Sequence, residues 1–319
     1  MNNKKYLSVG VAVLLSGVLL IATALTGSAA SNAYDQFKML LREDHAQFTN
    51  MTVAMNMSIS DNGKAVLNVV GDVKADKDAK NMSGQFQISG KGDEKTFEVY
   101  RSDDAVLLHF AGSENWYQPA SLKEYSDDEI ENYGRFGKEP MKDNEKLRDM
   151  LMDTLMGDLK DQVILDESNG LRTFSLTLDQ GNMPVLIQTV FSAGSEMHGG
   201  TKTMDVLAIA NLPVELQEVI TDMMVYHDLV DISGERTLKE IKVSLTVDQN
   251  NQPVAMALST SFSGLAKDGS AHDYAVNFEM NLSDLNTTVP DEADVNPSSI
   301  ITIDSTQFEN CGFSNRMHH

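Results

Sequence analysis

The sequence contains a single cysteine, Cys311, among its 319 residues. No disulfide can therefore form within the chain, and a domain of this size does not need one, because it can bury a sizeable core. Cys311 lies in a polar C-terminal stretch. We expect it to be incidental, with a disulfide to a second chain as the alternative.

Positive charge is also scarce. The chain has 25 Lys and Arg against 47 Asp and Glu, which gives a net charge of −22 at pH 7. Such a field repels polyphosphates, so the composition excludes nucleic acid as a partner. It also disfavours docking on an anionic lipid surface through a basic patch. The 41% apolar content nevertheless indicates a folded chain and not a disordered one.

Catalytic and metal-binding motifs are missing as well. The sequence has no G-x-S-x-G, no Ser followed three residues later by Lys, no H-E-x-x-H and no Walker-type loop. Its histidines are scattered without ligand spacing. Met223, Met224 and His227 could suit copper, but we favour a helix core for the two methionines and the start of a strand for His227. We therefore predict a non-enzymatic protein with no metal and no cofactor.

What the sequence does contain begins with an export signal. Residues 1–6 are basic, residues 7–25 are mostly apolar and uncharged, and small residues follow up to Ser31. This order predicts a signal peptide, residues 1–30, cleaved after Ala30. Because residues 7–25 nearly span a bilayer, an uncleaved anchor in the cytoplasmic membrane is the alternative. In both cases Lys4 and Lys5 stay inside, so the rest of the chain is extracytoplasmic, secreted or membrane-anchored.

Most of the exported part alternates with a period of two, which is typical of half-buried strands. In residues 51–59 the odd positions are apolar and the even positions are small or polar. Similar patterns predict strands at 65–74, 82–88, 96–101, 105–110, 115–118, 162–166, 171–179, 241–247, 254–262 and 274–282. Helical spacing predicts helices at 33–47, 141–160, 184–192 and 214–226.

These elements predict an α+β fold: a curved, half-barrel-like antiparallel sheet of about ten strands with helices on its concave, apolar face. The predicted exported domain is 31–290, as one sheet or as two similar halves, 31–135 and 136–290. Residues 291–319 form a polar C-terminal tail, apart from the apolar stretch from Ile300 to Ile303.

Methionine is the unusual component of the composition, with 18 residues. Met side chains either fill irregular gaps in a core or line a surface that adapts to variable apolar partners. If the second interpretation holds, strands and the 141–160 helix would enclose an apolar ligand. The candidate binding residues are Met55, Met57, Phe86, Ile88, Met150, Leu151, Leu155, Met256, Phe278 and Met280.

The closing hairpins carry a family resemblance, through the stretch from Val247 to Val254 and the stretch from Leu282 to Asn286 before Pro290. In its pattern from Ala33 to Pro290 the chain resembles the lipoprotein-carrier (Lol-type) superfamily, especially divergent extracytoplasmic members of Gram-positive bacteria. It departs from the lipoprotein members because Ser28 stands where the lipid-bearing Cys would be. The resemblance implies a half-barrel and helical lid that enclose an acyl chain or lipid, and a binding protein instead of a catalyst.

Two functions therefore stay open. One is a carrier or sensor of a lipid-like apolar ligand, bound between sheet and helices at the outer face of a bacterial cytoplasmic membrane. The other is a structural or protein-interaction module of the cell envelope, with a filled core and no small ligand. The discriminating feature is whether side chains fill the space over the apolar face, which a sequence does not reveal.

Overall fold

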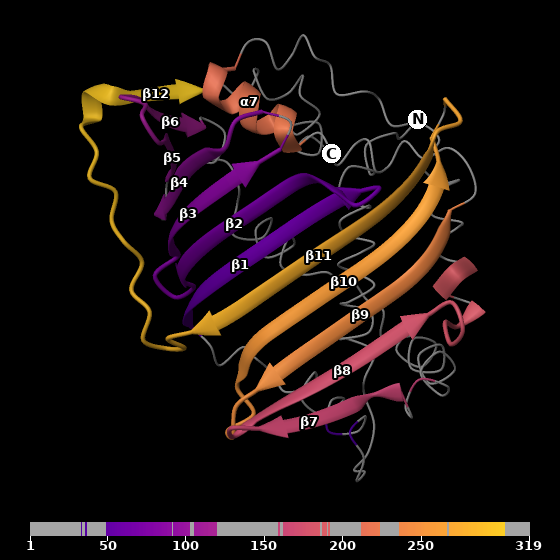
Figure 1. The fold of residues 1–319 in the computed structure, drawn as a ribbon. Helices are drawn as coiled ribbons and strands as arrows, with labels where there is room; N and C mark the ends of the chain where they lie inside the picture. Colours follow the sequence, from indigo (N-terminus) through magenta and orange to yellow (C-terminus); the bar gives the residue numbers. More distant parts are fainter. Residues whose placement is uncertain are drawn as a thin grey trace, which may run out of the picture.

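A computed structural model provides the fold, which is one open sheet of twelve strands (Figure 1). The residues that it describes are 33, 36, 49–90, 92–102, 105–119, 159, 162–185, 187–189, 191, 212–223, 236–266 and 268–303. The predicted helix 141–160, with the candidate binding residues Met150, Leu151 and Leu155, lies outside the described residues except for Leu159.

The strands occur in two runs. The first run is β1 (Asn50–Asp61), β2 (Lys64–Asp76), β3 (Asn81–Ser89), β4 (Lys95–Ser102), β5 (Ala105–Phe110) and β6 (Trp116–Pro119). The second is β7 (Ile164–Ser168), β8 (Leu171–Asp179), β9 (Thr237–Val247), β10 (Pro253–Leu265) and β11 (Ala271–Ser283), followed later by β12 (Ile300–Ile303). Each predicted strand is confirmed in place, and the total is twelve instead of about ten.

The order across the sheet is β12-β6-β5-β4-β3-β2-β1-β11-β10-β9-β8-β7. Neighbouring strands are antiparallel, except that β12 pairs with β6 in parallel. The two runs join where β1 pairs with β11, from Thr52 opposite Ser283 to Asp61 opposite Tyr274. We call this pairing the seam. Because of it the two runs share a single sheet, a point that the sequence left open.

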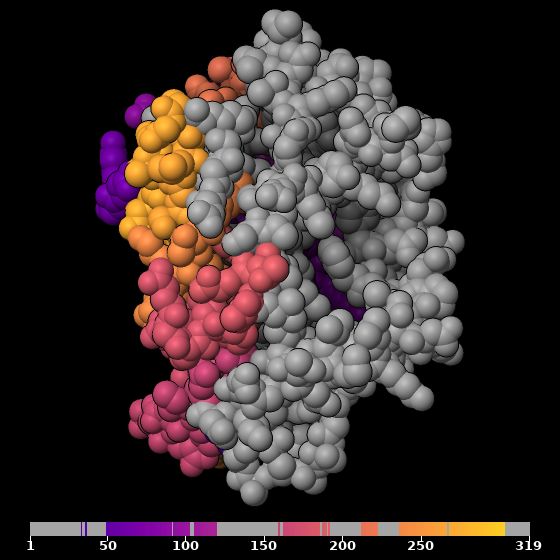
Figure 2. Space-filling view, turned by 90° about the vertical axis from the view of Figure 1, so that its right-hand side faces the viewer, coloured from indigo at the N-terminus to yellow at the C-terminus, as the bar shows by residue number. Residues whose placement is uncertain are grey.

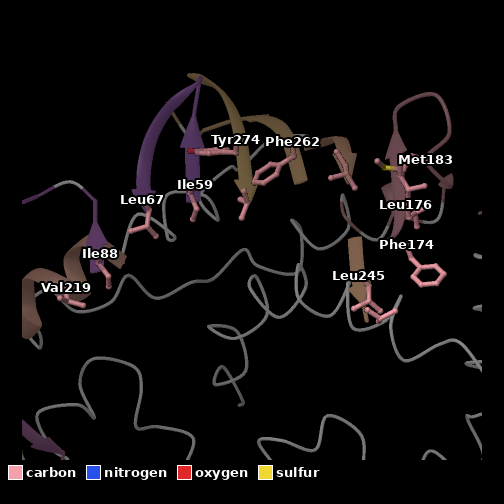
Figure 3. Packing of buried hydrophobic residues seen from close by; sticks show 14 of the residues in the cluster. Ile59, Leu67, Ile88, Phe174, Leu176, Met183, Val219, Leu245, Phe262 and Tyr274 are labelled. Carbon is pink, nitrogen blue, oxygen red and sulfur yellow. The ribbon is translucent and has the colours of Figure 1, made fainter. Parts of the chain in front are cut away.

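One face of the sheet carries the hydrophobic core. Because side chains alternate across a strand, the period-two pattern puts residues such as Ile59, Leu67 and Val276 on the same face, where they are buried. Figure 2 shows the strands as one layer, with β11 to β7 running from yellow to magenta. In Figure 3 the labelled strand residues Leu67, Ile59 and Ile88 project toward the same side of the sheet.

Helix α7 (Val214–Met223) packs on this apolar face against β3. Its Leu216 and Val219 are buried in the same cluster as Ile88 (Figure 3). At the end of the helix, Asp222 is buried and its carboxylate accepts a hydrogen bond from the backbone N–H of Gly92, 3.0 Å away. The helix therefore fixes the turn between β3 and β4.

Other helix predictions are tested in part. Residues 185, 187–189 and 191 are helical, as predicted for 184–192, and so are residues 33 and 36 of the predicted helix 33–47. No helix among the described residues has the length and apolarity needed to cross a bilayer. The apolar N-terminal stretch 7–25 lies outside the described residues.

Beyond β11 the chain crosses back toward the first run, to the other edge of the sheet (Figure 1). Thr288 is buried, and its backbone N–H donates to the Asn50 side chain. Asp291 binds Lys74 at 2.9 Å. A 3-10 helix, η5 (Pro297–Ser299), then leads into β12, where Ile303 is buried. Part of the stretch that the sequence places in a polar tail thus completes the sheet.

Candidate functional site

A continuous row of apolar residues crosses the core face from β8 to β5, with one residue from each strand between them. Successive strand pairings place these residues directly opposite one another. From β8 to β5 the row is Phe174, Leu245, Met256, Met280, Met55, Gly71, Phe86, Phe97 and Phe110. A register shift of one residue in any strand would break the row, since every side chain of that strand would change face.

A second row runs beside the first. It consists of Leu176, Val243, Leu258, Phe278, Met57, Val69 and Ile88, again in register from β8 to β3. Together the two rows contain every strand residue that the sequence proposed for ligand binding. The structure therefore places these seven candidates on one face and in two adjacent lines.

Burial divides these rows into a centre and two flanks. At the β8–β9 flank Phe174, Leu176, Val243 and Leu245 are buried. Most apolar side chains at the middle positions are only half-buried, although Leu258 of β10 is buried. We call the half-buried Met and Phe residues among them the central floor: Met55, Met57, Phe86, Met256, Phe278 and Met280. Ile88 falls outside it, because it is 2% exposed and belongs to the core beside Val219.

Two glycines shape the central floor beneath Phe86. A Cβ atom added to Gly71 would lie 2.5 Å from Phe86 Cδ1, and one added to Gly84 would lie 3.1 Å from Cε2. Both distances are shorter than an ordinary van der Waals contact. The Phe86 ring therefore lies low against the sheet only because two side chains are missing under it.

From Phe86 a chain of aromatic contacts leads to β6, the strand beside the edge strand β12. Phe86 stacks on Phe97 at a centroid distance of 5.3 Å, Phe97 contacts Phe110 at 5.7 Å, and Phe110 meets Tyr117 edge-on at 5.9 Å. Burial raises the pKa of the Tyr117 hydroxyl, and Glu215 of α7 raises it further. These contacts join the floor to an aromatic flank on this side.

The opposite face of the sheet has a different character. In the middle strands it presents Ser, Thr, Asn and Ala, for example Ser58, Asn277 and Ser259, which lie in hydrogen-bond contact across three strands. The chain's one tryptophan, Trp116, is on this face, stacked on His109 at 4.5 Å. An open depression lined by Asp179, Lys239 and Glu240, among others, is polar and lies apart from the central floor.

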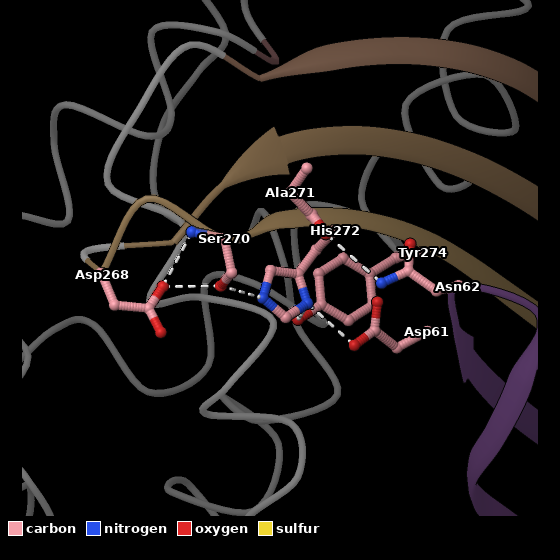
Figure 4. Close-up of polar contacts among 7 residues, drawn as sticks. All are labelled: Asp61, Asn62, Asp268, Ser270, Ala271, His272 and Tyr274. Carbon is pink, nitrogen blue, oxygen red and sulfur yellow. Dashed lines mark hydrogen bonds and ion pairs between the residues drawn. The ribbon is translucent and has the colours of Figure 1, made fainter.

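A polar cluster at one end of the seam escaped the sequence analysis (Figure 4). The His272 ring lies between Asp61, whose Oδ2 is 2.8 Å from Nδ1, and Ser270, whose Oγ is 2.8 Å from Nε2. Ser270 Oγ in turn donates to Asp268 Oδ1 at 2.6 Å. Hydrogen bonds from the Ser270 hydroxyl and backbone N–H, together with His272, hold the pKa of Asp268 below its usual range. His272 and Asp61 are 211 positions apart, so no spacing rule could pair them.

The part of the chain that the structure describes contains no ready set of metal ligands. No three His, Cys, Asp or Glu side chains come together there in a way that could hold an ion. The prediction that the protein works without a metal stays a prediction.

Comparisons with known proteins give a weak structural resemblance and nothing more specific. No family model and no curated protein sequence matches the chain. Among solved structures, a LolA superfamily protein from Nitrosomonas europaea is similar at 10% identity over 75% of this chain and 88% of that one, with a TM-score of 0.20. A bifunctional dehydratase-cyclase domain from ambruticin biosynthesis follows at 11% identity over 84% and 87%, with a TM-score of 0.14. At these scores the function has to be argued from the chain's own residues.

Proposed function

We propose that this protein is a non-enzymatic, extracytoplasmic carrier or sensor of a lipid-like apolar ligand that binds on the central floor. The observation that carries the proposal is the half-burial of a contiguous apolar surface, flanked on the same face by positions that are buried. Small-molecule sites are concave and mostly apolar, and their lining is usually formed before the ligand arrives.

The chemistry of the floor selects the ligand class. All six of its side chains are Met or Phe, and none carries a charge. Burial of apolar area stabilises a complex by about 25 cal/mol per Å², so an acyl chain laid across several strands gains affinity without any polar contact. Four of the six residues are methionines, whose flexible side chains adapt to chains of different shape.

The location follows from the N-terminal stretch and stays part of the proposal. A signal peptide or anchor of residues 1–30 would put the sheet outside the cytoplasmic membrane. There the strongly acidic chain would stay off anionic lipid surfaces while it exchanges single lipid molecules.

An envelope interaction module is the second candidate. Two observations favour it. At the flanks the residues of the same two rows are buried like an ordinary core, and the residues of the floor are themselves half-buried and not fully exposed. In that case the floor side chains would contact only other parts of the protein.

Native mass spectrometry of the full chain, purified without detergent and then extracted with organic solvent, tests the proposal. We expect a stoichiometric acyl or lipid species, displaced by a fluorescent C16 fatty acid. Met280→Asp should weaken binding of that probe at least about a hundredfold, because the acyl chain would strip water from a carboxylate that has no partner.

The matched control adds the same charge one residue further along the strand. Asn281 is exposed on the opposite face of β11, so Asn281→Asp should bind the probe like the original chain. Met256→Asp serves as a second floor variant in case Met280→Asp fails to fold. A clean apo mass that takes up no probe, or a folded floor variant with unchanged binding, would contradict the carrier function.

A further inference from the structure

The seam is the place where the two runs of strands meet, and it passes through the central floor. Met55 faces Met280 across it, and Met57 faces Phe278. Side chains tie the seam at both of its ends. At one end the Asn286 carboxamide accepts from the backbone N–H of Thr49 at 2.9 Å, and at the other end lie Asp61 and His272.

The contacts around His272 require a specific number of hydrogens. Three short contacts link four groups in line: Asp61 Oδ2 to Nδ1, Nε2 to Ser270 Oγ, and Ser270 Oγ to Asp268 Oδ1. Each contact needs one hydrogen, and carboxylates supply none at neutral pH. Ser270 has one hydroxyl hydrogen, so the imidazole must supply the other two. Only the protonated ring carries both.

A neutral ring leaves one contact without a hydrogen in either tautomer. With the hydrogen on Nδ1, Ser270 must donate to Nε2 and loses its bond to Asp268. With the hydrogen on Nε2, Asp61 loses its donor, even if the Tyr274 hydroxyl, 3.3 Å from Nδ1, donates to the ring instead. Asp61 Oδ1 is buried without a hydrogen-bond partner, so that tautomer would leave the carboxylate with no donor among the described residues.

Ser270, His272 and Asp61 also follow the order of a nucleophile, a base and an orienting acid. In this cluster, however, Asp268 accepts the hydroxyl hydrogen at 2.6 Å. A base cannot remove a hydrogen that the hydroxyl already donates elsewhere. The geometry therefore favours a structural proton-dependent link over an activated serine.

We propose that Asp61, His272, Ser270 and Asp268 form a proton-dependent clasp that holds this end of the seam closed when His272 is protonated. The groups that face the ring support a positive charge. Asp61 lies on β1, Asp268 in the turn before β11, and Tyr274 stacks on the ring at 5.5 Å. On β10 the residue opposite His272 is Gly264, and on β2 the residue opposite Asp61 is Lys64. Lys239 of β9 pairs with Asp273, the next residue along β11, at 2.7 Å. The ring is thus flanked by two carboxylates.

The consequence concerns the central floor, and this part rests on the proposed function. Because the strands of the seam supply Met55, Met57, Phe278 and Met280, a looser seam makes the floor less rigid. The clasp would then be complete at mildly acidic pH and would lose a hydrogen bond as the pH rises. Ligand affinity would therefore also fall as the pH rises.

The clasp is tested without ligand, so its outcome is independent of the carrier function. Spectra are compared at about pH 5.5 and about pH 8, the range in which histidine is the side chain that ordinarily changes charge. In the ¹⁵N-labelled full chain we expect both ring nitrogens of His272 to carry hydrogen at the lower pH. The amides of Ser58, Ser60 and Ala275 bond across the seam, because hydrogen-bonded pairs alternate from the bond between Asn62 and Asp273. They should exchange about tenfold more slowly at the lower pH, after correction for intrinsic rates, as for the loss of a hydrogen bond to a charged group.

Two variants separate the clasp from general pH effects. His272→Gln should abolish the pH dependence of exchange at the seam, whereas His109→Gln, which removes a half-buried histidine on the opposite face, should keep it. Ser270→Ala, which removes the hydroxyl between His272 and Asp268 but keeps the contact of the ring with Asp61, serves if His272→Gln fails to fold and should reduce the effect. A neutral His272 ring at both pH values, equal pH dependence in His272→Gln, or labelling of Ser270 by a fluorophosphonate would overturn the proposal.

Discussion

The β8–β9 flank and the central floor belong to the same two rows of the same face, yet they differ in burial and in composition. Phe174, Leu176, Val243 and Leu245 of the flank are buried, and so is Leu258 beside them on β10. Further along the two rows, Met256 of β10 and Phe278 and Met280 of β11 are only half-buried. Both regions follow the same alternation along their strands. Alternation therefore determines which face a residue joins, and it leaves open how fully that face is covered.

The flank and the floor also differ in residue type, and the difference matches the difference in burial. The flank uses Leu, Val and Phe, which have well-defined rotamers and specify a unique packing. The floor uses four methionines, which are flexible and accept different neighbours. A surface that only has to stay folded gains from the first choice, and a surface that takes variable apolar partners gains from the second. We infer that the flank stabilises the sheet while the floor is free to bind.

The largest expected effect falls on the flank. Phe174 is fully buried, with 0% exposure, so Phe174→Ala should lower the free energy of unfolding by about 3–5 kcal/mol. Urea denaturation measures the loss, and Met280→Ala in the floor is the comparison, with a clearly smaller cost. Equal losses for the two substitutions would show that the floor is packed like the flank, in favour of the interaction module.

A substitution of intermediate effect tests whether the shape of the floor matters for ligand binding as well as for the stability of the protein. Gly71→Ala puts a methyl group 2.5 Å from Phe86 Cδ1 and must lift the ring away from the sheet. Overpacking of this kind typically costs about 1–3 kcal/mol, and the raised ring should also weaken binding of a long acyl probe.

The double variant Gly71→Ala with Phe86→Leu is the control, because a smaller side chain leaves room for the methyl group. Recovery of both stability and probe binding is expected. If the single variant binds the probe unchanged while it loses stability, the ring's height has no part in ligand binding.

The sequence predicts the strands of this fold well because each of them has one covered face. The alternation in 51–59, for example, is enough to locate β1 and to place Met55 and Met57 on the apolar side. The partners of the strands are a different matter. Nothing in a local pattern pairs β1 with β11, or β12 in parallel with β6, because those contacts join segments far apart in the chain.

The same limit applies to the site. Seven of the ten candidate ligand-binding residues share one face, as their periodicity indicates, but the sequence could not show that Ile88 is buried under α7. It also could not show the cluster of Asp61 and His272, since each residue alone resembles an ordinary strand end. Burial and long-range polar contacts depend on how elements meet, and that information is spread over the whole chain.

The smallest expected effect is the one that most sharply separates the two regions. Met280→Leu keeps side-chain volume and apolarity, so it should change the free energy of unfolding by less than about 1.5 kcal/mol. Leucine is stiffer than methionine, however, and the floor would then adapt to fewer ligand shapes. We therefore expect nearly unchanged affinity for one acyl length and reduced affinity for shorter and longer chains, measured by competition against a fluorescent fatty acid. Met183→Leu, at a buried core position away from the floor, should leave the whole length profile unchanged. An identical profile for both variants would mean that methionine at position 280 is there for packing alone.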